Sequence, residues 1–514
     1  MTARRHSQVS AGRALRSMVR RRGRFGLKFA VSTSVACWAM AVAAAPPSVP
    51  WTPGTASRSA LELLVDRAGL DLPVMQWPLP RSAVIDALDA LPADLPEALA
   101  RARDVVRADL RRQESALLDV TARPRADTLA GYGDDATPGR SAELRTGIQQ
   151  STHYALQAGG RVETMSTPGR PGAELRLDDS AAVVGGFGVQ LQAWSHRSWW
   201  GPGWQNALAL SNNAPALDAV GIQRSSASTS RSPWLSWLGP WSGEAFIARS
   251  ERYADPARPL ILGGRLEARP FSHLELGVEY TAQWGGAGRR ESLGSFLDMI
   301  LGRHVNADTV QEQAADPGNG LAGYDARLRC PDVLRCAFYG QAIGEDMAGG
   351  LPSRFLAMGG AEVWSADGSQ RLFVEDARTS AYRAWFGPPL VDYAYRNYAY
   401  RDGYTDDRRW LGANAGPDSR IATLGWIDMG ADSVVRLSVG HVGSRIGSYS
   451  AETFDPATSG RLRSLSARRS LDWLGARWTP QFDWDRLHAP SGLHREARAS
   501  LEVSLPIDEL IHGR

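Results

Sequence analysis

Hydrophobic and polar positions follow two different periods along the chain, and the change between them divides it into two regions. Between residues 57 and about 119, apolar residues recur every three or four positions, which is typical of amphipathic helices. From about Ala142 onward, apolar and polar residues alternate, as in β-strands with one apolar face. We therefore predict a mainly β protein, in which a small N-terminal helical bundle precedes a large antiparallel sheet.

The first region predicts three helices. Residues 59–62 (Ser-Ala-Leu-Glu) have the form of a capping box, and the helix that they open would end before Gly69, a natural C′ residue. A second helix is expected over residues 82–91. A third carries Pro96 in its first turn, where the missing N–H costs nothing. Its apolar face would consist of Leu99, Val106, Leu110 and Leu117.

The clearest strand runs from His273 to Trp284, where every second residue is apolar and the alternate positions include Glu275 and Glu279. The same alternation recurs at residues 187–193, 435–440 and 499–505. The last strand is expected to finish near Leu505, although many bacterial barrels end in an aromatic residue and this sequence does not.

Periodicity alone does not separate a soluble sandwich from a membrane-spanning sheet. We favour the membrane because alternation spreads over about 370 residues without a helical pattern, and no later apolar run reaches the ~18 residues of a spanning helix. A spanning sheet must close, since lipid satisfies no unpaired edge. Candidates for its interfacial aromatic girdles are Tyr280, Trp284, Trp473, Trp478, Tyr398, Tyr400 and Tyr404.

Composition agrees with this interpretation. The 514 residues are 43% hydrophobic, yet the mean hydropathy is −0.29. A barrel produces that combination because only alternate strand residues face lipid.

Residues 1–45 are predicted to be a secretory signal peptide. Nine basic and no acidic residues lie between Met1 and Lys28, and an apolar run with small residues at Ala41, Ala43 and Ala45 follows. Its removal would change the formal net charge from +3 to −6, so nucleic acid is excluded as a partner. Two alternatives are weaker. The residues before Cys37 lack the bulky side chain of a lipoprotein signal, and a twin-arginine signal carries folded cargo.

We assign residues 46–140 to a periplasmic helical bundle and residues 141–514 to an outer-membrane barrel. Within the barrel, Cys330 and Cys336 are candidates for a disulfide, because outside the cytoplasm two cysteines six positions apart can close a small loop. Two free thiols are the alternative. No second Cys or His pair lies nearby, so we predict no metal site and no cofactor.

Four sequence blocks occur in a fixed order. Residues 199–215 contain Trp-Gly-Pro-Gly-Trp and Leu-Ser-Asn-Asn-Ala, and residues 269–286 run from Arg-Pro-Phe to Gln-Trp-Gly-Gly. Residues 344–353 contain Gly-Glu-Asp and Leu-Pro-Ser, and residues 400–419 contain Tyr-Arg-Asp-Gly-Tyr and Gly-Pro-Asp-Ser. Together they resemble the capsule assembly Wzi family over most of residues 57–480. The resemblance implies a barrel of about eighteen strands with helices at its periplasmic end, acting as a lectin-like anchor for capsular polysaccharide. Divergent members of the family occur with other exopolysaccharide systems.

No catalytic arrangement is evident. The sequence has no Gly-x-Ser-x-Gly, His-Glu-x-x-His or Walker motif. Glu275 and Glu279 would lie ~13 Å apart along a strand, too far for the paired carboxylates of a glycosidase. We predict no catalytic residue and no enzyme activity.

Glycan binding instead requires rigid aromatic faces beside planar hydrogen-bonding groups. Two stretches provide both, and the alternative is that they only shape turns and aromatic packing. The candidate polysaccharide-binding residues are Trp199, Trp200, Trp204, Asn212, Asn213, Tyr395, Arg396, Tyr398, Arg401, Tyr404 and Arg408.

The resulting hypothesis is a non-catalytic outer-membrane protein of a Gram-negative bacterium that anchors or assembles capsular or extracellular polysaccharide at the cell surface. Its expected partners are the polysaccharide, outer-membrane lipid and polysaccharide export machinery. The alternative is an outer-membrane channel for sugar or polysaccharide export. A lumen filled by loops and arginines would favour the anchor, whereas a wide pore lined with acidic residues would favour the channel.

Overall fold

A computed structural model describes residues 45–124, 128–137, 139–164, 173–250, 254–303, 305, 316–348, 351–382, 388–443 and 459–507. These residues lie in one compact unit that spans Ala41–Arg514. Except for Ala45, the expected signal peptide lies outside the described residues, as does the C-terminal tail from residue 508.

The described residues form four α-helices, one 3₁₀-helix and many strands. The helices are α1 (Thr55–Arg67), α2 (Arg81–Asp89), α3 (Glu97–Glu114), η1 (Ser236–Leu238) and α4 (Leu293–Ile300). The strands are β1 (Pro50–Trp51), β2 (Gln76–Trp77), β3 (Leu79–Pro80), β4 (Leu117–Arg123), β5 (Gly139–Arg145), β6 (Gln149–Gln150), β7 (Tyr154–Gln157), β8 (Gly159–Glu163), β9 (Glu174–Arg176), β10 (Ser180–Gly186), β11 (Val189–His196), β12 (Trp199–Trp200), β13 (Leu217–Arg224), β14 (Trp241–Arg249), β15 (Leu260–Phe271), β16 (Leu274–Trp284), β17 (Gly318–Arg329), β18 (Cys336–Ala348), β19 (Leu351–Trp364), β20 (Gln370–Tyr382), β21 (Pro389–Leu390), β22 (Thr405–Asp406), β23 (Arg409–Trp410), β24 (Arg420–Asp428), β25 (Ser433–Val442), β26 (Gly460–Arg469), β27 (Leu471–Trp473), β28 (Ala476–Ala489) and β29 (Gly492–Pro506).

The three predicted N-terminal helices are present, but the start of α1 and the end of α3 differ from the prediction. α1 begins at Thr55, four residues before the expected capping box, and Gly54 occupies its N-cap without a side-chain hydrogen bond. Its first turn is buried, so tertiary packing stabilises it in place of a local cap. Gly69 follows the C-cap with a φ of +68°, as the sequence predicts.

The predicted boundary between helices and sheet is wrong. α3 ends at Glu114, and Leu117, expected on its apolar face, opens β4. The predicted boundary at residue 140 therefore falls inside β5, the second strand of the sheet, although the first strand, β4, begins at Leu117. Because a helical period of 3.6 and a strand period of 2 can share the same few apolar positions, strand pairing decides where the helix stops.

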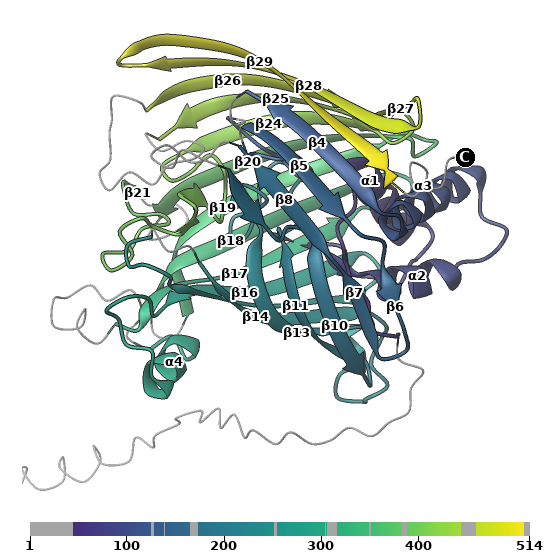
Figure 1. Cartoon of the computed structure of the whole chain (residues 1–514), viewed down its shortest axis with the longest axis horizontal. Helices are drawn as coiled ribbons and strands as arrows, with labels where there is room; N and C mark the ends of the chain where they lie inside the picture. Colours follow the sequence, from purple (N-terminus) through teal and green to yellow (C-terminus); the bar gives the residue numbers. More distant parts are fainter. Residues whose placement is uncertain are drawn as a thin grey trace, which may run out of the picture. The chain divides into compact units, whose positions relative to one another are not determined.

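One antiparallel sheet of 23 strand segments is the dominant element of the fold. Neighbours in the sequence are mostly neighbours in the sheet, and β4 at its start pairs with β29 at its end, with Leu117 opposite Pro506. In Figure 1 the yellow β29 accordingly runs beside the blue β4. The prediction of a mainly β fold with one large antiparallel sheet is confirmed.

The two faces of this sheet have the opposite polarity to those of a soluble protein. On β16, Leu276 and Val278 are 43% and 54% exposed, whereas Glu275 and Glu279 are buried. On β25, Leu437 and Val439 are exposed, while Arg436 and Ser438 are buried. Apolar side chains thus cover the outside and polar ones line the inside, the pattern of a sheet whose exterior meets lipid.

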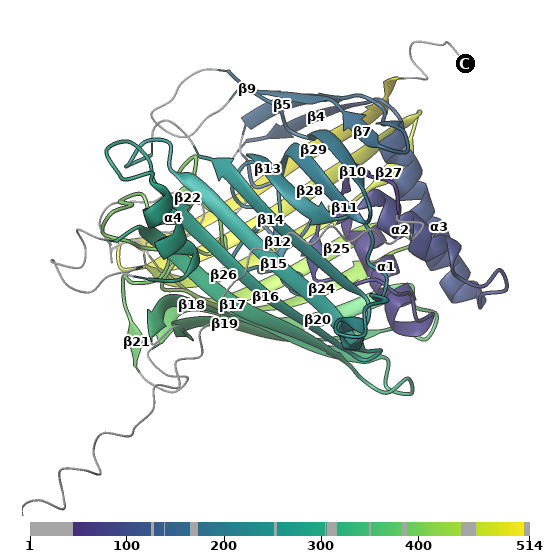
Figure 2. The same cartoon turned by 90° about the horizontal axis from the view of Figure 1, so that it is seen from below.

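The two ends of the strands differ in their connections. At one end, which we call the helix end, most turns are short, the connection over residues 225–240 with η1 being the exception, and α1, α2 and α3 lie close by (Figure 2). Cys330 and Cys336 form a disulfide across one of these turns. At the other end, the loop end, the connections are long and include α4 and residues 197–216 and 388–419. None of the helices described is long and apolar enough to cross a membrane.

Several aromatic residues expected in interfacial girdles lie elsewhere. Tyr400 and Tyr404 are fully buried among the loop-end connections, and Trp284 packs against Phe296 of α4. Trp473, in contrast, is exposed at a helix-end turn and tilts against Trp478. The sequence places aromatics near strand ends but does not say which connections cover them.

Candidate functional site

Four described chain segments pack on the polar side of the sheet, which we call the interior. Residues 45–80, including α1, enter from the helix end, and residues 128–137, 197–216 and 388–419 enter from the loop end. Every residue of α1 from Thr55 to Asp66 is buried. The loop-end segments pack against strand side chains in a shared apolar cluster that includes Trp200, Trp204, Leu210, Phe246, Ile343, Phe373, Tyr395, Tyr404 and Trp410.

The N-terminal segment and the Trp-Gly-Pro-Gly-Trp segment meet in the interior as a short sheet. β2 pairs with β12, so that Trp77 lies opposite Trp199, and the Gly201 N–H donates a hydrogen bond of 2.8 Å to the Met75 carbonyl. Strands whose paired residues Trp77 and Trp199 are 122 positions apart in the chain thus satisfy each other's backbone groups inside the protein.

Arg58 of α1 is the main link between these two segments. Its Nη1 and Nη2 donate to the carbonyls of Gly203 and Pro202 at 2.9 and 2.8 Å, and its Nε donates to Glu62 Oε1 at 2.9 Å. The guanidinium carbon also lies 4.0 Å from the ring centroid of Trp204, within cation–π range. The motif therefore binds an arginine of the protein's own N-terminal helix.

Its two glycines are required by the backbone. Gly201 has a φ of +135°, which side-chain-bearing residues rarely adopt. A Cβ on Gly203 would lie 2.2 Å from the Asn206 carbonyl oxygen and 2.5 Å from Met358 Cε. The motif is thus a tight turn that presents two carbonyl groups to Arg58.

The Leu-Ser-Asn-Asn-Ala block joins the inner loops to one another. Asn213 Nδ2 donates to the Trp410 carbonyl at 2.8 Å, and Ser211 Oγ donates to the Gly412 carbonyl at 2.6 Å. Asn212 Nδ2 donates to the carbonyls of Gly131 and Asp134 at 2.9 and 2.6 Å. These asparagines hold the loop-end connections in place.

Carboxylates on the inner face of the sheet accept backbone N–H groups of the filling segments. Glu375 of β20 accepts from the Trp204 N–H at 3.0 Å and from Asn206 Nδ2 at 2.7 Å, and Glu267 accepts from the Met75 N–H at 2.6 Å. Alternation along β16 predicts glutamates on the polar face, at Glu275 and Glu279, but no motif in the sequence marks Glu375. Its polar position in an alternating strand was the only available signal.

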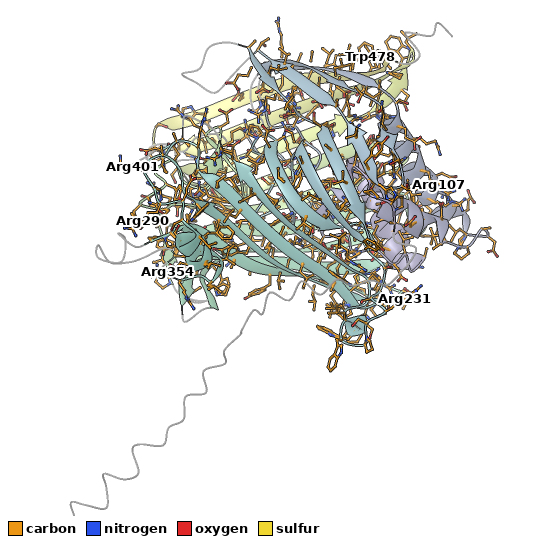
Figure 3. The ribbon with its side chains drawn as sticks, turned by 60° about the horizontal axis from the view of Figure 1, so that its bottom comes forward. Arg107, Arg231, Arg290, Arg354, Arg401 and Trp478 are labelled. Carbon is orange, nitrogen blue, oxygen red and sulfur yellow. A yellow bond between two sulfur atoms is a disulfide. The ribbon has the colours of Figure 1, made fainter. Side chains whose placement is uncertain are left out.

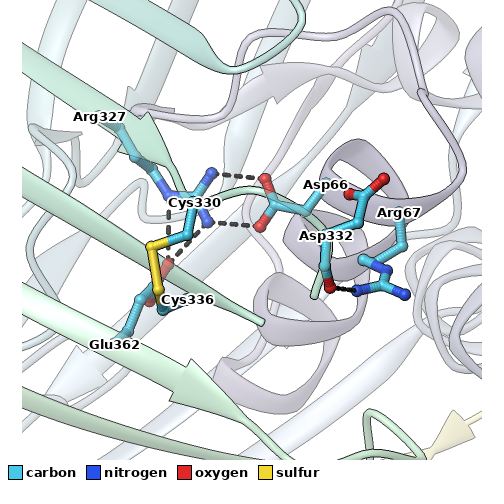
Figure 4. Close-up of a disulfide and its surroundings, with 7 residues drawn as sticks. All are labelled: Asp66, Arg67, Arg327, Cys330, Asp332, Cys336 and Glu362. Carbon is cyan, nitrogen blue, oxygen red and sulfur yellow. Dashed lines mark hydrogen bonds and ion pairs between the residues drawn. A yellow bond between two sulfur atoms is a disulfide. The ribbon is translucent and has the colours of Figure 1, made fainter. Parts of the chain in front are cut away.

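A buried ion-pair network fastens α1 to the strands (Figure 4). Arg327 donates to both oxygens of Asp66, at 2.8 and 2.6 Å, and to Glu362 at 2.6 Å. Arg371 pairs with the same Glu362 at 2.7 Å and with Glu62 at 3.1 Å. Burial raises the pKa of Glu62, although the guanidinium of Arg58 opposes this change. Each of these buried carboxylates nevertheless has at least one arginine partner within the protein.

A hydrophilic cavity of about 360 Å³ remains beside β4, β5 and β29. Its ionisable lining consists of Arg112, Asp119, Asp134, Asp135, Glu143, Arg145, Arg161, Asp178, Asp179, His196, Arg197 and Glu502. Burial would raise the pKa of Asp135, but Arg197 and Arg161 hold it well below its usual range. Asp135 and Arg161 are accordingly an ion pair, with 2.7 Å between Oδ2 and Nη2.

The predicted polysaccharide-binding residues fall into three groups. Most of them are buried structural residues: Trp199, Trp200, Trp204, Asn213, Tyr395 and Tyr404. Asn212, Arg396 and Arg408 are partly exposed. Tyr398 and Arg401 are exposed, and Arg401 lies at the loop end in Figure 3. A polymer outside the protein can reach this last pair and cannot reach the tryptophans.

Aromatic and arginine side chains from separate connections gather around this exposed pair. Tyr398 donates to Asp316 Oδ2 at 2.8 Å, and Arg401 lies 3.6 Å from Asp255. The Arg289 guanidinium lies 4.9 Å from the ring centroid of Tyr400. Arg289 could not be predicted from the sequence because it is more than a hundred residues from Tyr400 in the chain. Within the described residues, no His, Cys, Asp and Glu side chains cluster as a metal site.

Comparison with known proteins places this architecture in a family. A family model described as capsule assembly protein Wzi matches residues 115–432. An uncharacterized 55.8 kDa protein in the cps region of Klebsiella pneumoniae is 30% identical over 336 residues, which are 63% of this chain and 64% of that protein. The chain therefore aligns with less than two thirds of the length of this relative.

A solved structure shares the fold. It is that of Wzi from Escherichia coli, described as an outer-membrane protein involved in group 1 capsule assembly and as a carbohydrate-binding β-barrel. The two are 21% identical, with a TM-score of 0.74, and the match covers 89% of this chain and 99% of the other. Since the family model spans more than half of the chain and the fold agrees, this protein belongs to the capsule assembly protein Wzi family.

Proposed function

We propose that this protein is an outer-membrane barrel that binds capsular or extracellular polysaccharide at its loop end and retains it at the cell surface without a catalytic step. Two findings support this function. The family is described by capsule assembly, and the E. coli relative is described as carbohydrate-binding. Outer-membrane lipid and the polysaccharide export machinery are the further partners that we propose.

The proposal includes a closed barrel of about eighteen strands. β5 and β6, β7 and β8, β9 and β10, and β26 and β27 are consecutive segments that continue one another, and β21 has only two residues. With the four pairs joined and β21 set aside, about eighteen strands remain. The pairings of β4 with β29, of β5 with β8 and of β7 with β10 support a ring. A ring leaves no unpaired edge in lipid.

The lengths of the connections support an orientation. Outer-membrane barrels have short periplasmic turns and longer extracellular loops. We therefore place the helix end, with α1, α2 and α3, in the periplasm and the loop end outside the cell. This orientation puts Tyr398 and Arg401 where they can contact external polymer.

The filled interior is the observation that favours an anchor over a channel. α1 and three loop-end connections, residues 128–137, 197–216 and 388–419, occupy the interior. Arg58 and the ion pairs of Arg327 and Arg371 hold α1 in this arrangement. The cavity beside β4, β5 and β29 is the feature that favours the channel alternative. Conductance of the purified protein in planar bilayers separates the two. We expect no large stable openings, and their appearance would support the channel.

Polysaccharide retention tests the anchoring role directly. In a strain lacking the protein, we expect normal total polysaccharide with a larger fraction in the medium, and complementation by the wild type restores the cell-bound fraction. The double variant Tyr398→Ala, Arg401→Ala is expected to be made and inserted normally but to release polymer. Stacking and charge-assisted contacts are lost in this variant.

A matched control removes one exposed arginine and one exposed aromatic residue at the opposite end. Arg231 and Trp237 are exposed on a helix-end connection, and Figure 3 shows Arg231 far from Arg401. The double variant Arg231→Ala, Trp237→Ala is expected to retain polymer like the wild type. Equal retention by both double variants would contradict the proposed binding surface at Tyr398 and Arg401. Unchanged retention in the deletion strain would contradict the proposed anchoring function.

A further inference from the structure

The outer face of the sheet carries a row of arginines near the loop end of β26, β28 and β29. Arg463 lies directly opposite Arg486, and Arg486 lies directly opposite Arg495. The inner face of these strands is identified by Arg468 and Arg498, which pair with the interior residues Asp134 and Asp485. Since strand side chains alternate, the three arginines point outward.

A second basic row follows, one step closer to the loop end. It runs across four strands as Arg420, His441, Arg461 and His488, each opposite the next. Arg420 pairs with Asp376 at 3.2 Å. Among the described residues, no ion pair involves Arg461 or the three arginines of the first row.

On the other side of the arginines, toward the helix end, the next row is apolar. Leu437, Leu465, Trp484 and Ala497 lie opposite one another in that order across β25, β26, β28 and β29. Leu437 and its other neighbour Leu424 are about half exposed. The basic rows therefore lie at the boundary between the apolar outer belt and the long connections.

This arrangement is unfavourable without a ligand. Side chains directly opposite on antiparallel strands have Cβ atoms ~5 Å apart, and like charges at such positions are destabilising. Beside an apolar belt, water and salt screen the charges less than on an open surface. Arginines bind phosphate oxygens in bidentate fashion, so an anion with more than one phosphate would neutralise several of them at once.

We propose that Arg463, Arg486 and Arg495, assisted by Arg461, form a binding site for the phosphate groups of an anionic membrane lipid at the extracellular boundary of the bilayer. The proposal rests on the membrane insertion and orientation given under the proposed function. The lipid's acyl chains would lie along Leu437, Leu465 and Trp484, directly below its headgroup. A soluble polysaccharide lacks such chains and would have to displace the lipid that covers these residues.

The test compares two triple variants of the full-length protein with equal charge change. The first is R463Q, R486Q and R495Q. The control is R140Q, R249Q and R469Q, which removes three exposed, outward-facing arginines from three separate strands. Both are purified in neutral detergent and titrated with diphosphoryl lipid A, with phosphatidylcholine and with inorganic phosphate. Bound lipid is counted by native mass spectrometry, and the Tm is measured at each step.

We expect diphosphoryl lipid A to bind the wild type and the control variant and to raise their Tm. The first triple variant should lose at least tenfold in lipid A affinity, with phosphatidylcholine binding unchanged. In neutral detergent alone its Tm should equal or exceed that of the wild type, because the like-charge row is gone. That result also shows that the variant is folded.

Three results would overturn the proposal. The first is equal lipid A affinity in the two triple variants. The second is a loss of phosphatidylcholine binding by the first triple variant as large as its loss of lipid A binding, which would indicate a general loss of lipid contact. The third is full competition by inorganic phosphate, which would indicate a site for the free anion. Polymer release with unchanged lipid A binding would instead assign the row to the polysaccharide. The retention assay with Tyr398 and Arg401 variants is independent, so failure of either idea is recognised separately.

Discussion

Arginines inside and outside the sheet have opposite surroundings. Inside, Arg327 is almost fully buried and pairs with both Asp66 and Glu362. Outside, Arg463, Arg486 and Arg495 oppose one another across neighbouring strands. A buried charge must be paired within the protein because no solvent reaches it. A charge on the outer face can rely on what surrounds the protein, so its missing partner indicates a ligand.

Aromatic residues show the same division. Trp204 inside donates from Nε1 to Glu362 Oε2 at 2.8 Å and stacks with Arg58. Trp234 and Trp237 on a helix-end connection are exposed. The inner tryptophans therefore stabilise the arrangement of segments, and only outer ones are available to lipid or partners.

The largest expected effect on stability is at Arg58, which links α1 to the Trp-Gly-Pro-Gly-Trp segment. Arg58→Ala removes the donor to the buried Pro202 carbonyl and one of the two donors to both the Gly203 carbonyl and Glu62. It also removes the cation on Trp204, and together these losses should lower the free energy of unfolding by about 3–5 kcal/mol. Thermal unfolding in detergent measures it. Arg107→Ala is the control, because Arg107 makes an exposed ion pair with Asp89 worth at most about 1 kcal/mol. Similar losses in both variants would contradict the role of Arg58.

The outer face should respond strongly to a new charge. Val278→Arg places a cation on the lipid-facing side of β16 and should cost about 2–4 kcal/mol if the residue lies at mid-bilayer depth. Folding into lipid vesicles, followed by denaturant titration, measures this cost. Val333→Arg, on an exposed helix-end turn, should change stability by less than about 0.5 kcal/mol. A harmless Val278→Arg would argue against lipid at this face.

A smaller effect is expected for the carboxylate that holds the Trp-Gly-Pro-Gly-Trp segment. Glu375→Gln keeps the size but replaces one acceptor oxygen by an amide donor that faces other donors, at a cost of about 1–3 kcal/mol. Glu97→Gln on the exposed side of α3 is the matched control, with no measurable change expected. Denaturant midpoints of the two variants provide the comparison.

The smallest effect should have the opposite sign. Arg486→Gln removes the central charge of the outer row and should stabilise the protein in neutral detergent by about 0.2–1 kcal/mol. Added salt should reduce this gain, because it screens the repulsion in the wild type. A Tm series over ionic strength checks both statements. Destabilisation by Arg486→Gln would mean that the arginine has a partner within the protein.

The sequence by itself determined that a helical region precedes a region of alternating strands, and it located several of these strands. A period of 2 predicts a strand and assigns each residue to one of two faces, so the exposed Val278 and the buried Glu279 followed directly from the alternation. Other features were equally local: the helical character of the N-terminal region, the C′ role of Gly69 and the ordered motifs that carry the family resemblance. The limit between α3 and β4 was not, because Leu117 fits either period.

Only the tertiary structure decided which of the candidate aromatic residues are buried inside the protein and which are exposed. Trp199, Trp204 and Tyr404 lie in connections without periodicity, and their burial depends on partners far away in the chain. Arg58 and Gly203 are 145 positions apart, and Arg327 and Asp66 are 261 positions apart. A local pattern reports the local backbone. Whether a loop folds into the interior or remains outside depends on the sum of such distant hydrogen bonds and ion pairs, which no single segment contains.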